Sequence, residues 1–177
     1  MASSAPEQLT PRARQIAAAA RELLEAEGPD GLSMRRVAER VGIRAPSIYK
    51  HLPDKEALEA AIISAGFAEW AAEFEAAAGR ADEPVRALAR AYREYALRHP
   101  HLYRLMTERP LARERLEPGV EDRAAAPIVA AIGDADGARA MWAFAHGMTI
   151  LELNGRFPPG ADLDAAWERG ITAFRPR

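Results

Sequence analysis

Cysteine is absent from this chain of 177 residues, so no disulfide, thiol nucleophile or cysteine-bound zinc can form. The sequence also lacks any run of eighteen or more uncharged apolar residues, which a membrane-spanning helix needs. Its first residues carry neither a basic stretch nor an apolar export segment. We therefore expect a cytoplasmic protein, without metal or cofactor, whose fold depends on packing alone.

Aromatic residues make up only 7% of a chain that is 49% apolar and rich in alanine. This composition favours closely packed helices over a β-sandwich and predicts an all-α fold, and the apolar spacing along the chain predicts about nine helices. A helix is expected to begin at Thr10-Pro11, stop near Gly28, and be followed by short helices capped from Ser33 onward. Apolar spacing and Pro/Gly breaks predict further helices over residues 53–79, 84–98, 100–107, 120–132, 137–153 and 163–174. Residues 1–8 are small and polar and are expected to be disordered.

Positive charge is concentrated in one segment, although the net charge of the chain is −2. Between residues 32 and 55 only Glu39 and Asp54 oppose the basic side chains, which are Arg35, Arg36, Arg40, Arg44, Lys50 and Lys55. A cluster of this size is equally typical of a solvated helix face, so the order of the residues must decide its meaning.

That order predicts a helix-turn-helix. Val37, Ala38 and Val41 form the apolar face of a first short helix, and Gly42 can adopt the positive φ that a tight turn requires. Ile48 faces inward from a second short helix. The outward side of this second helix carries small residues and hydrogen-bond donors suited to a DNA major groove; these residues are Arg44, Ala45, Ser47, Tyr49, Lys50 and His51.

The stretches from Gly31 to Gly42 and from Ala45 to Leu58 closely resemble the DNA-binding signature of the TetR family. The resemblance implies that Ser33, Tyr49 and Lys55 position DNA phosphates. It also implies that base edges are approached by Arg44, Ala45, Ser47 and Lys50. Two alternatives stay open: Tyr49 packs on the first helix, or Lys55 only pairs with an acid.

Lys55 is expected in the first turn of its helix, where a cation opposes the helix dipole unless a phosphate offsets the cost. The chain has lysine only at Lys50 and Lys55, which suggests that a compact ammonium is wanted at these two places.

A single short recognition helix makes too few contacts for tight specific binding, so a two-fold dimer on a palindromic site is expected. Apolar stripes near the end of the sequence are the candidate dimer interface, in particular Met148, Leu151, Trp167, Ile171 and Phe174. The alternative is that these stripes only close the core of the monomer.

The run Trp142-Ala143-Phe144-Ala145-His146-Gly147 resembles the TetR subgroup whose C-terminal domain is named for Trp, His and Gly. The resemblance implies a small-molecule cavity in the second half of the chain, for an apolar or amphipathic effector. Its candidate lining is Tyr92, Tyr95, Met106, Trp142 and His146. The alternative is that these residues belong to a packed core, where aromatic residues and methionines at helical spacing are found more often than in a pocket.

The sequence thus predicts a helix-turn-helix domain over residues 9–54 and a ligand-binding and dimerisation domain over residues 55–177. The expected function is that of a repressor that a ligand releases from its operator, with a dimeric regulator lacking ligand control as the alternative. A metal carrier or enzyme built on His99, His101, His146 and Glu152 is a remote alternative, because their spacing does not place them on one helix face.

Overall fold

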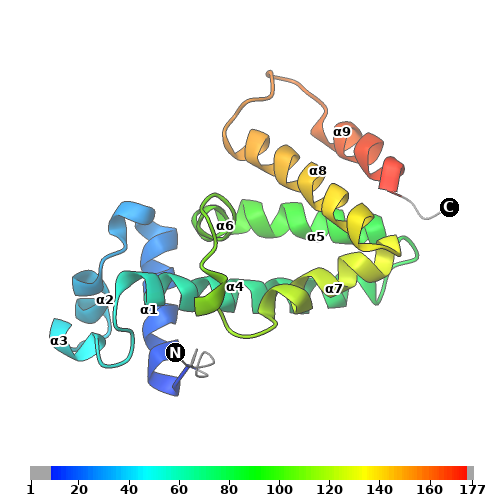
Figure 1. Ribbon diagram of the computed structural model, residues 1–177. Coiled ribbons are helices and arrows are strands. Elements are labelled where there is room, and N and C mark those ends of the chain that lie inside the picture. The colour runs from blue at the N-terminus through cyan, green and yellow to red at the C-terminus, as the bar shows by residue number, and fades with distance from the viewer. Residues whose placement is uncertain (1–8, 175–177) are drawn as a thin grey trace. The chain divides into compact units, whose positions relative to one another are not determined.

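The computed structural model describes residues 9–174, and within that range it contains nine α-helices, three short 3-10 turns and no β-strand (Figure 1). The all-α prediction is confirmed. The helices are α1 (Pro11–Glu27), α2 (Met34–Arg40), α3 (Ala45–Ile48), α4 (Lys55–Ala78), α5 (Pro84–Arg98), α6 (Pro100–Thr107), α7 (Val120–Ile132), α8 (Ala135–Leu153) and α9 (Leu163–Ile171). Residues 1–8, which were expected to be disordered, lie outside the described range. No helix within that range has both the length and the apolar character needed to cross a bilayer.

The helices form two compact units. The first runs up to Phe67 and also includes His99–Val120, so it holds α1, α2, α3, the first half of α4, and α6. The second comprises Ala68–Arg98 and the residues from Glu121 onward, and it holds the rest of α4 together with α5, α7, α8 and α9.

Helix α1 begins and ends where local sequence signals predict. The Thr10 side chain accepts a hydrogen bond from the Ala13 amide at 3.2 Å, and proline occupies the first turn. Gly28 ends the helix with φ +73°, a region that favours glycine. The predicted apolar stripe is buried, which makes α1 the base on which the other helices of the first unit pack; it includes Ile16, Ala20, Leu23 and Leu24.

Helix α6 packs against α1 within the first unit. The Leu102 amide donates to Glu25 Oε1 at 2.9 Å, which satisfies one of the free amides at the start of α6. A Cβ added to Gly66 of α4 would lie 2.6 Å from Met106 Sδ, so α4 and α6 also approach closely. Through these contacts α6 belongs to the same unit as the predicted helix-turn-helix.

An aromatic cluster joins α4 to α5 in the second unit. The ring of Trp70 lies 5.8 Å from that of Phe74, 5.2 Å from Tyr92 and 5.6 Å from Tyr95, measured between centroids. All four side chains are buried. Rings at such separations contribute beyond the area that they remove from water.

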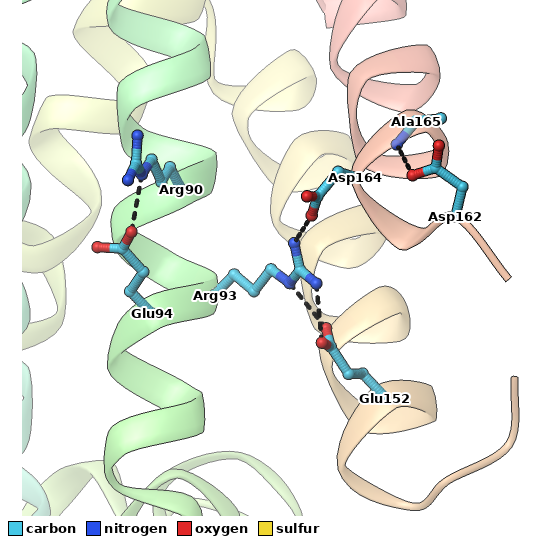
Figure 2. A network of polar contacts seen from close by, with 7 residues as sticks. All are labelled: Arg90, Arg93, Glu94, Glu152, Asp162, Asp164 and Ala165. Atoms are coloured by element: carbon cyan, nitrogen blue, oxygen red, sulfur yellow. Dashed lines mark hydrogen bonds and ion pairs between the residues drawn. The ribbon is translucent and has the colours of Figure 1, made fainter. Parts of the chain in front are cut away.

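Arg93 of α5 holds both α8 and α9 (Figure 2). Its Nε and Nη2 each donate to a carboxylate oxygen of Glu152 at 2.8 Å, and its Nη1 donates to Asp164 at 2.6 Å. The side chains of Arg93 and Glu152 are only 22% and 17% exposed, so water screens this pair less than the surface pairs.

The ring of Phe144 on α8 packs against α9 at Gly170, which has no side chain. Its ring lies 5.5 Å from that of Trp167 and 5.9 Å from that of Phe174. A Cβ added to Gly170 would lie 2.0 Å from Phe144 Cζ. The approach of α8 to α9 therefore requires glycine at this position.

We predict that Gly170→Ala lowers the free energy of unfolding by about 1–3 kcal/mol, because the added methyl overpacks the contact with Phe144. Urea denaturation would measure the loss. In a Phe144→Leu background the same substitution should cost clearly less, since the opposing ring is gone. An equal loss in both backgrounds would contradict this account of the glycine.

Candidate nucleic-acid interface

The turn between α2 and α3 has the predicted construction. Ser33 caps α2, and its Oγ accepts a hydrogen bond from the Arg36 amide at 3.3 Å. Gly42 has φ +69°, and a Cβ there would meet no atom within 4 Å, so conformation rather than space selects glycine. The Ile43 amide donates to the Ala38 carbonyl at 2.9 Å and closes the turn.

Helix α3 is a single turn anchored by Ile48, whose side chain is fully buried. Of the residues predicted to face DNA, Ala45 and Ser47 are half-buried, and Arg44, Tyr49, Lys50 and His51 are exposed. Tyr49 is 49% exposed, which leaves half of its surface available for contact. The predicted outward residues therefore do lie on the accessible side of this segment.

Ion pairs divide the basic residues of this region into two groups. Those of α2 are paired with acids: Arg35 with Glu39 at 3.5 Å, Arg36 with Glu27 at 2.7 Å, and Arg40 with Glu22 at 2.7 Å. Arg44 and Lys50, by contrast, form no ion pair with any residue between 9 and 174. Uncompensated positive charge is thus concentrated at the ends of α3.

Lys55 lies at the start of α4 and remains 49% exposed. Its Nζ is 3.6 Å from Glu59 Oε1, and Arg109 Nη1 is 3.8 Å from the same oxygen. Lys55 therefore does have an acidic neighbour, as the alternative of a pairing with an acid requires. The contact is long, however, and Glu59 shares it with a second cation.

Asp54 fixes the first turn of α4. Its Oδ1 accepts the Ala57 amide at 2.7 Å, and Arg115 Nη1 donates to the same oxygen at 2.8 Å. The hydrogen bond from the Ala57 amide, and next to it that from Arg115, hold the pKa of the Asp54 carboxyl below its usual value. The Glu117 amide donates to the buried Ser64 hydroxyl at 3.0 Å. The segment after α6 is therefore fastened to the end of α4 that carries Lys55.

The five residues predicted to line a ligand cavity lie in three places. Tyr92 and Tyr95 belong to the buried aromatic cluster. Trp142 is 47% exposed on α8, and its ring centroid is 6.2 Å from that of His146. Met106 is buried in the first unit. Tyr92 and Tyr95 thus both lie against Trp70, and Trp142 lies near His146; a ligand cavity lined by the five residues stays a prediction.

The five residues predicted to form a dimer interface also differ in exposure. Leu151 is 42% exposed, and Met148 and Phe174 are half-buried. Trp167 and Ile171 are each 4% exposed. Trp167 and Ile171 are therefore packed within the single chain, as the alternative of a monomer core expects. Their part in a dimer interface stays a prediction.

The sequence did not predict the ion pairs between distant segments, among them those of Arg93 and Arg115. Arg93 meets Glu152 and Asp164, and Arg115 meets Asp54 across 61 residues. Only the capping position of Asp54 has a local sequence signal. Within residues 9–174 no three His, Asp or Glu side chains lie close enough together to hold a metal ion. Glu152, one of the residues on which the metal-carrier or enzyme alternative was based, forms an ion pair with Arg93.

Two family profiles match the chain. One, described as bacterial regulatory proteins of the tetR family, matches residues 16–62. The other, described as the Tetracyclin repressor-like C-terminal domain, matches residues 85–174. An uncharacterized HTH-type transcriptional regulator of Mycobacterium tuberculosis is 34% identical over 143 residues, which are 75% of this chain and 66% of that protein. The chain spans less than two thirds of this relative and of three further curated relatives.

Solved structures agree with the profiles. A TetR variant from Acinetobacter baumannii AYE in complex with minocycline is 25% identical with a TM-score of 0.62, covering 90% of this chain and 91% of that one. The multidrug binding protein EbrR complexed with imidazole is 26% identical with a TM-score of 0.65, covering 95% and 97%.

We predict that Asp54→Ala lowers the free energy of unfolding by about 1 kcal/mol at pH 7, the usual value of a helix cap. The pKa of Asp54 is lowered in the folded state, so its contribution is fully present above the ordinary carboxyl pKa of about 4. As the pH falls through the lowered pKa the contribution disappears.

Denaturant titrations of wild type and variant between pH 7 and pH 3 would test this. The stability difference should shrink at the acidic end. A difference that stays constant or grows there would contradict the assigned cap and ion pair.

Proposed function

Since this chain belongs to the TetR family of bacterial regulatory proteins and is a TetR-type transcriptional regulator, we propose that it represses transcription as a homodimer on a palindromic operator, from which a small molecule releases it. The observation that carries the proposal is the pair of exposed, unpaired cations Arg44 and Lys50 at the ends of α3. We assign DNA binding to residues 9–54, ligand binding and dimerisation to residues 55–177, and the second half to the subgroup named for Trp, His and Gly.

In this proposal the two recognition helices of a dimer enter successive major grooves about one turn apart. Arg44 and Lys50 offer donors to guanine edges, and the small Ala45 and Ser47 allow close approach. Ser33, Tyr49 and Lys55 hold phosphates, with His51 nearby. The hydrogen bond from Arg115 to Asp54 supports this role for Lys55, because it fixes the backbone next to the lysine at the start of α4.

The exposed face of α8 supports the proposed dimer. Leu151 is a large apolar residue that is 42% exposed in the single chain. Helix α8 also carries Gly147, where a Cβ would meet nothing within 4 Å, so another helix can approach closely there. We propose that this face, with Met148 and Phe174 at its border, meets its copy across a two-fold axis.

Ligand control is the finer part of the proposal. Two similar structures are described as complexes with minocycline and with imidazole, and we extend the ability to bind a small molecule to this chain by similarity. An effector releases DNA only if it prefers the conformation that cannot bind DNA. The alternative, a dimeric regulator without ligand control, is favoured by the tight packing of Tyr92 and Tyr95.

We predict that selection from a random DNA pool with the purified protein recovers a palindrome. Lys55→Ala and Tyr49→Ala should weaken binding to all sequences, and the Lys55 change should also reduce the salt dependence by about one phosphate contact. Arg44→Ala and Lys50→Ala should in addition relax base preference, each by about 1–3 kcal/mol.

Arg35→Ala is the matched control, because Arg35 is an exposed basic residue that pairs with Glu39 on α2. It should change affinity much less than Lys50→Ala. Recovery of no enriched site, both from protein as purified and from protein refolded without ligand, would rule out operator binding. Equal effects of all five substitutions would reject the residue assignments.

We predict that Leu151→Glu converts a dimer to a monomer, because it places a charge on an apolar face that the partner covers. Sedimentation velocity would detect the change. Leu97→Glu is the control, since Leu97 is a similarly exposed leucine, 41%, on α5. A monomeric wild type, or dissociation by the control alone, would refute the proposed face.

A further inference from the structure

Helices α5 and α9 border a cleft of about 520 Å³ in the second unit. This volume lies within the range of small-molecule sites. Its apolar wall consists of Ala89, Leu97, Trp167 and Ile171. Three arginines of α5, Arg86, Arg90 and Arg93, face the same space. The cleft thus combines an apolar wall with three guanidinium groups.

Arg90 is the cation with spare capacity in this cleft. Only its Nε is engaged, by Glu94 at 2.7 Å, and the side chain is 79% exposed. Its two terminal nitrogens have no acceptor among residues 9–174. A guanidinium in this condition presents parallel N–H groups that match the two oxygens of a carboxylate.

Trp167 adds a donor that the protein leaves without an acceptor. Its side chain is 4% exposed, and its Nε1 is buried without a hydrogen-bond partner. The ring is held in place by the edge of Phe144 at 5.5 Å and by the guanidinium of Arg93 at 5.8 Å. A buried N–H without an acceptor is costly, so an oxygen that reaches it from the cleft gains more than one that binds at the surface.

Arg86 has a second donor of this kind. Its Nε is also buried without a partner, although its terminal nitrogens meet Glu83 and Glu168. Both unsatisfied nitrogens are buried, so neighbouring side chains must shift to admit an acceptor. Arg86 and Arg90, which are 42% and 79% exposed, have room for such a shift.

The acids that line the cleft do not oppose an anion. Glu94 is bound by Arg90, Glu168 by Arg86, and Asp164 by Arg93. An entering carboxylate therefore meets acids that are already neutralised and the open fork of Arg90.

We propose that this cleft binds an apolar carboxylate, an acid with an aromatic or aliphatic body. Its carboxylate pairs with the terminal nitrogens of Arg90, its body lies against Trp167, Leu97 and Ile171, and an oxygen satisfies the Trp167 N–H. The binding site itself is inferred from the geometry of the second unit alone. Only its meaning as an effector site rests on the proposed repressor function.

Sodium 2-naphthoate is the probe, and 2-naphthalenemethanol, with the same rings and no anion, is its matched control. Indole N–H signals of ¹⁵N-labelled protein are followed by NMR during titration, and Trp167→Phe assigns the signal of Trp167. We expect that signal to move saturably with the carboxylate. The alcohol should bind at least about tenfold more weakly, the ratio typical of losing a charge-assisted bond.

Arg90→Gln should weaken naphthoate binding about tenfold. Arg139→Gln is the control variant, because Arg139 is a similarly exposed arginine that pairs with Asp136 on α8, and it should leave binding unchanged. A Trp167 signal that does not move, a shift confined to Trp142, equal binding of acid and alcohol, or equal effects of the two arginine variants would each overturn the proposal. No DNA is present in the assay, so failure of this site and failure of operator binding are scored separately.

Discussion

The fork of Arg93 is the interaction on which the arrangement of the second unit depends. One guanidinium on α5 holds Glu152 of α8 with two bonds and Asp164 of α9 with a third, so one side chain links α5 to both helices (Figure 2). A lysine offers a single point charge and cannot reproduce this geometry. The bond to Glu152 is the stronger one, because Asp164 is 87% exposed and screened by water.

Both proposed activities of the second unit follow from this link. The α8 helix presents Leu151 outward, and α9 supplies Trp167 and Ile171 to the cleft beside α5. A ligand that displaces α9 from α5 must stretch the bond between Arg93 and Asp164, which is the exposed and weaker half of the fork. If the proposed acid binds the two positions of α9 with different affinity, its binding shifts the balance between them.

Ion pairing has the opposite role in the first unit, where it decides which cations stay available. The arginines of α2 meet acids, whereas Arg44 and Lys50 do not. The first group fixes α2 and contributes little net charge to its surroundings. The second group keeps its charge for a phosphate or a base edge. The sequence count of basic residues could not separate the two groups, because the acids that pair with Arg36 and Arg40 lie on α1.

Local signals were sufficient for the secondary structure and for the family. Residues 84–98, 100–107 and 120–132 were predicted as helices with the bounds that α5, α6 and α7 have, because Pro residues and Gly breaks mark these ends. Helix α8 begins two residues earlier than expected, since Asp134 rather than a later residue accepts the Gly137 amide and caps it. The last predicted helix ends at Ile171 and continues as a 3-10 turn.

Tertiary structure alone decided which apolar and charged residues face one another. Trp142 and Trp167 both lie on apolar helical stripes, yet one is 47% exposed and the other 4%, because only Trp167 is covered by Phe144 and Arg93. Arg115 pairs with Asp54, which is 61 residues away in the sequence, and Arg93 pairs with Asp164, which is 71 residues away. Periodicity reports the face on which a residue lies within its own helix, and capping reports where that helix starts. Neither periodicity nor capping gives the distance between two helices. That distance is set by packing, and it determines the proposed dimer face and the cleft.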